Sequence, residues 1–371
     1  MKNVLISGAS IGGPALAYWL RRYGFSVTVV ERARGMRPGG QAIDVRGPAL
    51  EVVERMGLGD QLRSLSTNMR GMSMVDPEGN ELFSSTTHTL SGGDLSSPDV
   101  ELLRDDLARL LFDAVDGVEY LFDDTITAID GTRVTFEKAA PRDFDVIVGA
   151  DGLHSNVRRL VFGPEEQFIS HLGTNLAVFT APNFLGLDHW QIFQQGDVVG
   201  GGIMSARSNA ECRVYMGFNG SVDFDYRDVD GQRRLLAEMF ADAGWVWPTA
   251  LKHMWEAPDF HFDSMSQIRM ETWSRGNVVL LGDAGYCGSP LSGQGTSMAL
   301  VGAYVLAGEL ASNPDGAFQR YEEILRPYVT ANQEMALKNQ ANGGPTEEFG
   351  DVVNSLQLPT YGELAQTIDD K

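Results

Sequence analysis

Small residues near the N-terminus form a turn of the kind that binds phosphate. Residues 8–13 read Gly-Ala-Ser-Ile-Gly-Gly, whereas the dinucleotide-binding turn has glycine at its first, third and sixth places. Gly8 would form the tight turn, Ser10 is small enough for a pyrophosphate to approach, and Gly13 permits close packing of helix on strand. Because free N–H groups at a helix N-terminus favour negative charge, this turn, which includes Gly12, predicts a dinucleotide phosphate site.

An acidic residue follows where the ribose of such a ligand is expected. Glu31 ends the apolar run 27–30 and could accept a hydrogen bond from a ribose hydroxyl. Its negative charge predicts a ribose without a 2′-phosphate, and the neighbouring Arg32 is a further candidate contact. The turn by itself does not separate NAD from FAD.

Two later segments place small and acidic residues after apolar runs. Residues 145–158 read Asp-Val-Ile-Val-Gly-Ala-Asp-Gly-Leu-His-Ser-Asn-Val-Arg, and residues 276–284 read Gly-Asn-Val-Val-Leu-Leu-Gly-Asp-Ala. A strand that ends in Gly282-Asp283 puts a carboxylate at the carboxyl edge of a sheet, where it can accept hydrogen bonds from ligand hydroxyls. Residues 290–295 then form a turn of small residues into a new helix, whose N–H groups could stabilise an anion.

With these three motifs in this order, residues 1–340 resemble the single-component FAD-dependent aromatic hydroxylases typified by para-hydroxybenzoate hydroxylase. Within that family the chain looks most like the tetracycline-inactivating and polyketide-tailoring monooxygenases. The resemblance implies an α/β fold, in which an FAD-binding Rossmann-like three-layer domain is interleaved with an antiparallel β-sheet substrate domain and followed by a C-terminal helix. It also implies FAD as the cofactor.

The resemblance assigns cofactor roles to matching residues. Asp283 would bind the ribityl chain, the turn 290–295 would face the flavin pyrimidine edge, and Asp151 would lie near the pyrophosphate. Arg104 would lie near the ribityl–phosphate region, and the loop 39–44 would contact the flavin ring. In the alternative interpretation, Asp151 and Arg158 form a helix cap and an ion pair, and Arg104 is a surface charge. The full set of expected cofactor contacts is Gly8, Ser10, Gly12, Gly13, Glu31, Arg32, Gly40, Asp44, Arg104, Asp151, Gly282, Asp283, Pro290, Gly293, Gln294 and Gly295.

The activity that the resemblance implies is hydroxylation of an aromatic or polycyclic, tetracycline- or polyketide-like molecule with NAD(P)H and O₂, through a flavin C4a-hydroperoxide. We find no Ser/His/Asp set, HExxH or CxxC motif, so we expect no catalytic protein residue and no metal, since the flavin carries the chemistry. No second nucleotide fold is evident, and NAD(P)H would therefore bind transiently. A reductase or dehydrogenase of the same fold and a non-catalytic flavin-binding protein remain alternatives. Residues 244–248 differ in spacing from the tryptophan motif of flavin-dependent halogenases, and core packing explains them more simply.

Polar and aromatic residues of the middle region are candidate substrate contacts. They are Gln191, Phe193, Gln195, Arg213, Tyr215 and Phe224, together with Met204. Strand alternation predicts Gln191, Phe193 and Gln195 on one face and Arg213 with Tyr215 on another, and Gln195 is the preferred contact. Such residues are also common in an ordinary core.

The expected elements would position these motifs. A βαβ unit is predicted from a strand at 4–7, a helix at 14–23 and a strand at 26–30. Residues 172–224 have the short β-rich pattern of an antiparallel meander, and 278–281 form another buried strand. Helices are expected at 49–56, 102–115, 233–243, 247–254, 296–310 and 318–339, the last bent or ended at Pro327.

The motifs divide the chain into interleaved parts. We expect the FAD-binding domain at 1–72, 98–168 and 265–310, the substrate domain at 73–97 and 169–264, and a bridging helical segment at 311–371. Too few residues follow Leu310 for a thioredoxin-like third domain, which favours a monomer or weak homodimer.

Composition excludes several classes of protein. The 371 residues carry 29 Lys and Arg against 50 Asp and Glu, a net charge of −21. Such a surface repels phosphate backbones and anionic lipids, which disfavours nucleic-acid and membrane binding. No intact signal-peptide core is present, and no apolar run approaches the ~20 residues of a membrane span. Two cysteines are compatible with a reducing cytosol, so a cytoplasmic protein is expected.

Overall fold

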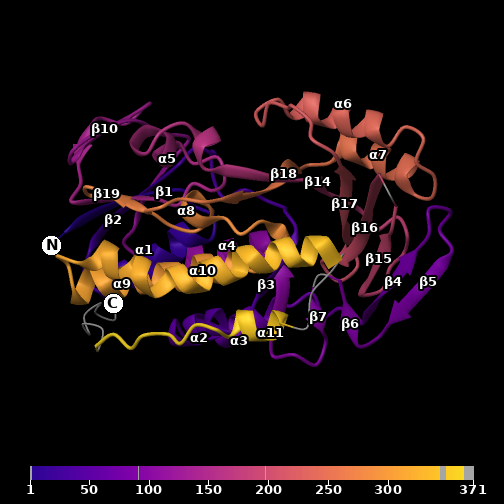
Figure 1. The fold of residues 1–371 in the computed structure, drawn as a ribbon, viewed down its shortest axis with the longest axis horizontal. Coiled ribbons are helices and arrows are strands. Elements are labelled where there is room, and N and C mark those ends of the chain that lie inside the picture. Colours follow the sequence, from indigo (N-terminus) through magenta and orange to yellow (C-terminus); the bar gives the residue numbers. More distant parts are fainter. Residues whose placement is uncertain (1, 91, 197, 343–347, 363–371) are drawn as a thin grey trace.

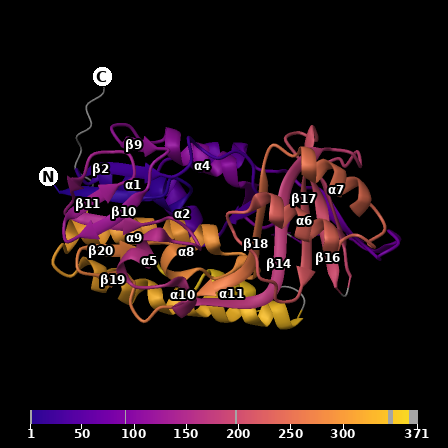
Figure 2. The same cartoon turned by 90° about the horizontal axis from the view of Figure 1, so that it is seen from above.

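The computed structural model describes residues 2–90, 92–196, 198–342 and 348–362. Two large sheets lie at opposite ends of the elongated molecule, and β14 and β18 extend between them (Figures 1 and 2). The long helix α10 (Ala317–Asn342) runs from the first sheet toward the second. The space between the sheets is therefore bordered by segments far apart in the sequence.

The first sheet has six strands in the order β19 (Ser274–Arg275), β20 (Val278–Leu280), β13 (Val146–Gly149), β1 (Asn3–Ser7), β2 (Ser26–Glu31) and β9 (Glu119–Phe122). All neighbouring pairs are parallel except β19 with β20. Strands β13 and β20 are buried throughout because both faces of the sheet are covered. The carboxyl ends of β1, β13 and β20 lead into the three glycine-containing motifs.

Helices cover one face of this sheet, and a smaller sheet covers the other. The helical side packs α1 (Gly12–Arg22) and α9 (Gly295–Ser312) against β1 and β2, with α10 outside α9. The opposite side carries α5 (Asn156–Val161) and a sheet of β10 (Ile126–Asp130), β11 (Arg133–Phe136) and β12 (Arg142–Asp143). These three layers confirm the predicted α/β fold class.

The second sheet has the order β18 (Phe260–Ile268), β14 (Ile169–Pro182), β17 (Glu211–Asn219), β16 (Val199–Ala206), β15 (Trp190–Gln194), β4 (Gly71–Val75) and β5 (Glu81–Ser85). Its pairs are antiparallel except β15 with β4. Helices α6 (Val229–Met239) and α7 (Trp247–Glu256) pack on one face. Trp247 is fully buried there and donates a hydrogen bond from Nε1 to Gln194 Oε1 at 2.7 Å, so it belongs to the core.

Shorter elements complete the fold. Two two-stranded antiparallel sheets form, β3 (Ala42–Val45) with β8 (Val100–Leu103) and β6 (His88–Thr89) with β7 (Gly93–Asp94). The remaining helices are α2 (Pro48–Arg55), α3 (Gly59–Ser64), α4 (Arg104–Asp113), α8 (Asp283–Tyr286) and α11 (Phe349–Val353), with 3₁₀ turns at Glu165–Gln167 and Pro290–Ser292.

One helix prediction was wrong at its start. Leu102 and Leu103 pair with β3 as a buried strand, and the helix that was expected from 102 begins at Arg104. Of the two outcomes expected at Pro327, a helix end is not seen, because α10 continues through this residue, and a bend stays a prediction. The predicted domain division stays a prediction; its boundaries after residues 72 and 264 fall inside β4 and β18.

Candidate functional site: a cavity between the two sheets

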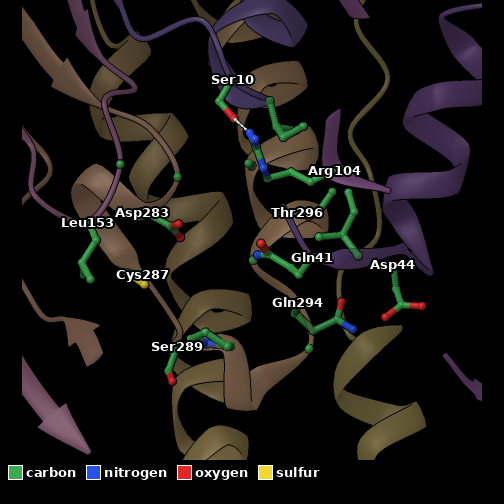
Figure 3. Close-up of a pocket in the computed structure, with 18 of the residues that line it drawn as sticks. Ser10, Gln41, Asp44, Arg104, Leu153, Asp283, Cys287, Ser289, Gln294 and Thr296 are labelled. Atoms are coloured by element: carbon green, nitrogen blue, oxygen red, sulfur yellow. Dashed lines mark hydrogen bonds between the residues drawn. The ribbon is translucent and has the colours of Figure 1, made fainter. Parts of the chain in front are cut away.

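A cavity of about 2580 Å³ lies between the two sheets. Its wall on the first sheet includes the N-terminal turn, Glu31, Arg104, Asp151, Asp283 and most of the turn 290–295. Its wall on the second sheet comes from β14, β17 and β18, at Leu176, Val178, Tyr215, His261 and Asp263. Figure 3 shows Ser10, Gln41, Arg104, Asp283 and Gln294 around this space.

The N-terminal turn is as tight as its glycines predict. Gly8 has a φ of +110°, and a Cβ there would lie 2.3 Å from the carbonyl oxygen of Ala150. A Cβ at Gly13 would lie 1.9 Å from the carbonyl oxygen of Gly8, so no other residue fits without moving the backbone. The turn leads directly into α1, which begins at Gly12. A phosphate bound there would face the N-terminus of α1.

Glu31 braces this turn from the end of β2. Its Oε2 accepts a hydrogen bond from the backbone N–H of Ala9 at 2.9 Å, and its Oε1 accepts one from Ala33 at 2.8 Å. Glu31 and the exposed Arg32 both line the cavity. Contact of either residue with a ribose stays a prediction.

Arg104 is not a surface charge. It begins α4, and its guanidinium donates to Ser10 Oγ at 3.1 Å and to the carbonyl of Gly39 at 3.0 Å (Figure 3). Burial, with the nearby charge of Arg37, lowers the pKa of Arg104. Its Nε is buried and has no hydrogen-bond partner among the described residues.

Asp151 and Arg158 form the helix cap and ion pair of the alternative interpretation. Asp151 accepts from Ser155 Oγ at 2.5 Å and from the backbone N–H groups of Asn156 and Val157 at the start of α5. Burial raises the pKa of Asp151. The fully buried Arg158 pairs with Glu165 at 2.6 Å. Asp151 nevertheless lines the cavity, so a cofactor contact stays a prediction.

Asp283 and Gln294 present further polar groups on the first-sheet wall of the cavity. Asp283 begins α8 after Gly282, and burial raises the pKa of its carboxyl group. Gln294 is fully buried, and among the described residues neither its Nε2 nor its Oε1 has a hydrogen-bond partner. Gly293 is left-handed, and α9 starts at Gly295, so the predicted turn into a helix is present.

These groups fit a dinucleotide flavin. Buried polar atoms without partners are costly, and those of Arg104 and Gln294 belong to residues of the cavity wall, where a polar ligand could satisfy them. The turn at residues 8–13 offers a phosphate site, and Asp283 offers a hydrogen-bond acceptor further along the same cavity. Asp44, on β3, lines this cavity as well, whereas Gly40 lies just before β3 and does not line it.

Of the six expected substrate contacts, only Tyr215 lines the cavity. Gln191 is buried against Glu101, with Nε2 3.4 Å from Oε2. Phe193 packs over Gly202, and Phe224 packs on Phe262 with ring centroids 4.8 Å apart. Gln195 is exposed after the end of β15. Arg213 is buried and donates from Nε to the carbonyl of Gly40 at 2.9 Å. Direct contact of these side chains with a substrate stays a prediction.

The expected separation of these residues onto two faces was wrong. Gln191 pairs with Met204, and Met204 pairs with Arg213, across adjacent strands. Cross-strand partners point to the same face of a sheet, so Gln191 and Arg213 share one face. The rings of Phe193 and Tyr215 also lie 6.1 Å apart on that face. Alternation within a strand cannot reveal register between strands.

Sequence reasoning did not single out β14 and β18 as the cavity wall. His261 and Asp263 alternate along β18 and both line the cavity. Burial, with the charges of Arg104 and Arg37, lowers the pKa of His261 to about 4, so its ring is neutral at pH 7. The alternation in residues 260–264 was a usable signal, but it does not show which face meets the first sheet.

His154 forms a polar contact between the loop after β13 and strand β18 of the second sheet. Its Nδ1 lies 2.7 Å from Glu165 Oε1, and its Nε2 lies 3.1 Å from Asp263 Oδ2 on β18. Its ring stacks on Tyr226 with centroids 4.2 Å apart. Burial favours the neutral ring, but hydrogen bonds to the two carboxylates outweigh it and raise the pKa of His154 to about 9.

Among the described residues, no group of three or more His, Cys, Asp or Glu side chains is arranged to hold a metal ion. In the same part of the chain, no helix combines the length and apolar character needed to cross a membrane.

Known proteins are similar to this chain in sequence and in fold. Residues 1–341 match the FAD binding domain family. An uncharacterized protein of Mycobacterium tuberculosis (strain H37Rv) is 54% identical over 372 aligned positions, covering 97% of this chain and 100% of the relative. A flavin-dependent monooxygenase of Legionella longbeachae is 38% identical over 343 positions, covering 90% and 88%. The crystal structure of tetracycline destructase Tet(51) matches with a TM-score of 0.88 at 35% identity, covering 97% of this chain and 100% of that one.

The fold and cavity define a flavoprotein of the FAD-dependent monooxygenase class, and the chain belongs to the FAD binding domain family. It is an enzyme whose relatives include named flavin-dependent monooxygenases. Within this class its fold is similar to that of the tetracycline destructases.

Proposed function

We propose that this enzyme uses NAD(P)H and O₂ to hydroxylate an aromatic or polycyclic small molecule of the tetracycline or polyketide type. The observation that carries the proposal is the continuous cavity of about 2580 Å³, which joins the dinucleotide turn to the inner face of the second sheet. Ligand pockets are commonly about 300–1,000 Å³. This cavity therefore has room for FAD and a second, sizeable ring system.

The division of labour follows from the side chains. FAD, when bound, supplies hydride acceptance and oxygen activation, which the protein's own side chains do not. The residues of this chain would bind and orient the cofactor at the N-terminal turn and Asp283, and would keep the reacting region dry. Leu176 and Val178 give the second-sheet wall an apolar surface for a flat ligand, and Tyr215 and His261 add polar groups.

Two observations support the substrate class. Apolar walls with few polar groups suit a conjugated ring system with scattered oxygen substituents. Similarity to the tetracycline destructase Tet(51) over 97% of this chain favours a polycyclic ligand. The two cysteines favour a cytoplasmic enzyme.

Stimulated oxidation of NAD(P)H tests this function. The purified protein, reconstituted with FAD, is incubated with NADH or NADPH, and aromatic polyketides including tetracycline are added one at a time. We expect one class of compound to accelerate NAD(P)H consumption and to gain one oxygen atom by mass spectrometry. Turnover that continues unchanged without O₂ would identify a dehydrogenase or reductase instead. A protein that does not bind FAD would contradict the whole proposal.

A further inference from the structure

Side chains from both ends of the molecule bind the backbone of residues 39–42, which we call the 39–42 segment. It reads Gly-Gly-Gln-Ala, and its last residue, Ala42, begins β3. Gly39 and Gly40 are buried, whereas Gln41 and Ala42 line the cavity. Loops normally expose their backbone polar groups to water. Here the polar groups of the segment are bound by protein instead.

Helix α4 provides the contacts from the first sheet. The backbone N–H of Gly39 donates to Asp105 Oδ2 at 3.0 Å, and its carbonyl accepts from Arg104 Nη2 at 3.0 Å. The carbonyl of Gln41 accepts from the backbone N–H of Arg104 at 3.1 Å. Two successive residues of one helix start thus hold three backbone groups.

The second sheet provides a matching set. The N–H of Gly40 donates to Oδ2 of Asp259, the residue just before β18, at 3.2 Å. Its carbonyl accepts from Arg213 Nε at 2.9 Å, and the N–H of Ala42 donates to the hydroxyl of Tyr215 at 2.9 Å, both from β17. Arg213 is itself fixed by Glu211 at 2.8 Å and is 1% exposed. The segment is therefore attached to helix α4 and to the second sheet at once.

The glycine pair is what allows these contacts. Gly39 and Gly40 have φ values of +75° and +101°. A Cβ at Gly39 would lie 1.8 Å from Asp259 Oδ2, and one at Gly40 would lie 2.5 Å from Arg104 Nε. Side chains at these places would displace the charged groups. The local sequence and the long-range contacts thus specify the same conformation.

One side chain of the segment projects into the cavity. Figure 3 shows the Gln41 carboxamide between Arg104 and Gln294, pointing toward the open space near Asp283. Among the described residues it has no hydrogen-bond partner in the protein. A carboxamide offers a donor and an acceptor side by side, which matches the alternating N–H and C=O groups of a flavin pyrimidine ring.

We propose that Arg213, Tyr215 and Asp259 are positioning residues: they hold the 39–42 segment in one conformation and thereby aim Gln41 at the flavin. This assigns Arg213 and Tyr215, which sequence alone suggested as substrate contacts, to the cofactor side of the site. The second sheet then controls how tightly the first binds FAD. The proposal rests on the FAD dependence above and adds residues that act on it from the other end of the molecule.

Amide exchange tests the positioning role without cofactor. In the FAD-free protein, Tyr215→Phe removes only the hydroxyl that binds Ala42, and one lost hydrogen bond corresponds to about fivefold faster exchange. We expect this acceleration at residues 39–42 by hydrogen–deuterium exchange. Tyr120→Phe is the control, because the Tyr120 hydroxyl is buried without a partner among the described residues. Equal protection of the segment in both variants would overturn the proposal.

FAD titration tests whether the Gln41 side chain is oriented toward the flavin. We expect Tyr215→Phe, Arg213→Lys and Gln41→Ala each to raise the FAD Kd about fivefold or more, since each removes one hydrogen bond. Arg213→Lys keeps the positive charge beside Glu211 but removes the Nε donor that binds the carbonyl of Gly40. If Tyr215 acts through Gln41, the double variant will be weakened by less than the product of the single effects. Full additivity, or an unchanged Kd in a folded Tyr215→Phe variant, would overturn the proposal.

The amide-exchange test and the FAD titration can each give a negative result independently of the other. A wild-type protein that binds no FAD would refute the proposed function and the aim of Gln41, whereas the exchange pattern would still decide whether the segment is held. Direct substrate contact by Arg213 and Tyr215 predicts the opposite result: normal exchange and normal FAD affinity, with a raised KM for the substrate.

Discussion

At the scale of single residues, the cavity wall concentrates buried polar groups that the protein does not satisfy itself. Gln294 and the Nε of Arg104 have no partner among the described residues, and Asp283 carries a carboxyl group whose pKa burial raises. Such groups destabilise the ligand-free fold. Their presence on one wall is therefore better explained by ligand binding than by folding.

Replacing Asp283 distinguishes a role of this residue in FAD binding from a role in folding. We expect Asp283→Ala to weaken FAD binding about 10- to 100-fold, the equivalent of hydrogen bonds to a charged group worth about 1.5–3 kcal/mol. The melting temperature of the FAD-free protein should stay equal or rise, because a buried carboxylate is removed. Equilibrium titration and calorimetry check both values. Asp143→Ala, at an exposed ion pair with Arg133, is the control. Unaltered affinity would mean that Asp283 does not contact the cofactor.

The glycines of the 39–42 segment give a second test at this scale. Gly40→Ala places a Cβ 2.5 Å from Arg104 Nε at a φ of +101°. Gly131→Ala, in a turn with a φ of +56° and no atom within 4 Å of a Cβ, carries only the backbone strain. We expect Gly131→Ala to lose about 1 kcal/mol of unfolding free energy and Gly40→Ala about 1–3 kcal/mol more. Urea unfolding measures the difference, and equal losses would show that the clash relaxes freely.

At the scale of elements, β18 connects the two sheets through His154. The imidazole lies between Asp263 of β18 and Glu165, with Arg158 on the far side of Glu165. A protonated ring satisfies both carboxylates, whereas a neutral ring can donate to only one of them. The contact between these elements therefore depends on proton uptake by His154.

Stability should follow that protonation. The pKa of His154 is about 9 in the fold against an ordinary value of 6.5, so the contact stabilises the fold fully below about pH 6.5 and less as the pH rises through 9. We expect the wild type to exceed His154→Gln by up to about 3 kcal/mol near pH 6, with the difference shrinking toward pH 10. Urea unfolding at several pH values measures it. His88→Gln, at an exposed histidine, is the control. A difference that does not vary with pH would contradict the charged contact.

At the scale of the whole molecule, one cavity is built from both sheets, so a ligand that fills it should stabilise the molecule as a unit. The wall draws on residues from Ser7 to Thr360, which no single segment of the chain contains. Binding to the native state alone adds stability by mass action.

Thermal unfolding with and without FAD tests this coupling. At an FAD concentration of 100 times Kd the gain is about 2.7 kcal/mol, and we expect one unfolding transition that moves up by a few degrees. Riboflavin, which lacks the phosphates and the adenosine, should give a smaller shift at equal concentration. Two transitions, of which only one responds to FAD, would show that the sheets unfold separately.

The sequence by itself determined the local parts of this protein. The turn at residues 8–13, the strand that precedes Gly282 and the helix that follows Gly293 each depend largely on local backbone geometry, and each is present. The fold class followed from the resemblance to the FAD-dependent aromatic hydroxylases that these three motifs carry. A Cβ at Gly8 or Gly13 would lie 2.3 or 1.9 Å from a backbone carbonyl oxygen, and Gly282 and Gly293 have positive φ values, so each position favours glycine and leaves a visible trace in the sequence.

Only the tertiary structure decided which side chains of the second sheet meet the first. The register between strands places Gln191 and Arg213 on one face of the second sheet. The packing of the two sheets makes β14 and β18 part of the cavity wall and brings the Tyr215 hydroxyl to the backbone N–H of Ala42. These contacts join residues more than a hundred positions apart in the chain. Alternation gives a strand two faces but does not say which one faces the first sheet, because that choice depends on packing of the whole molecule.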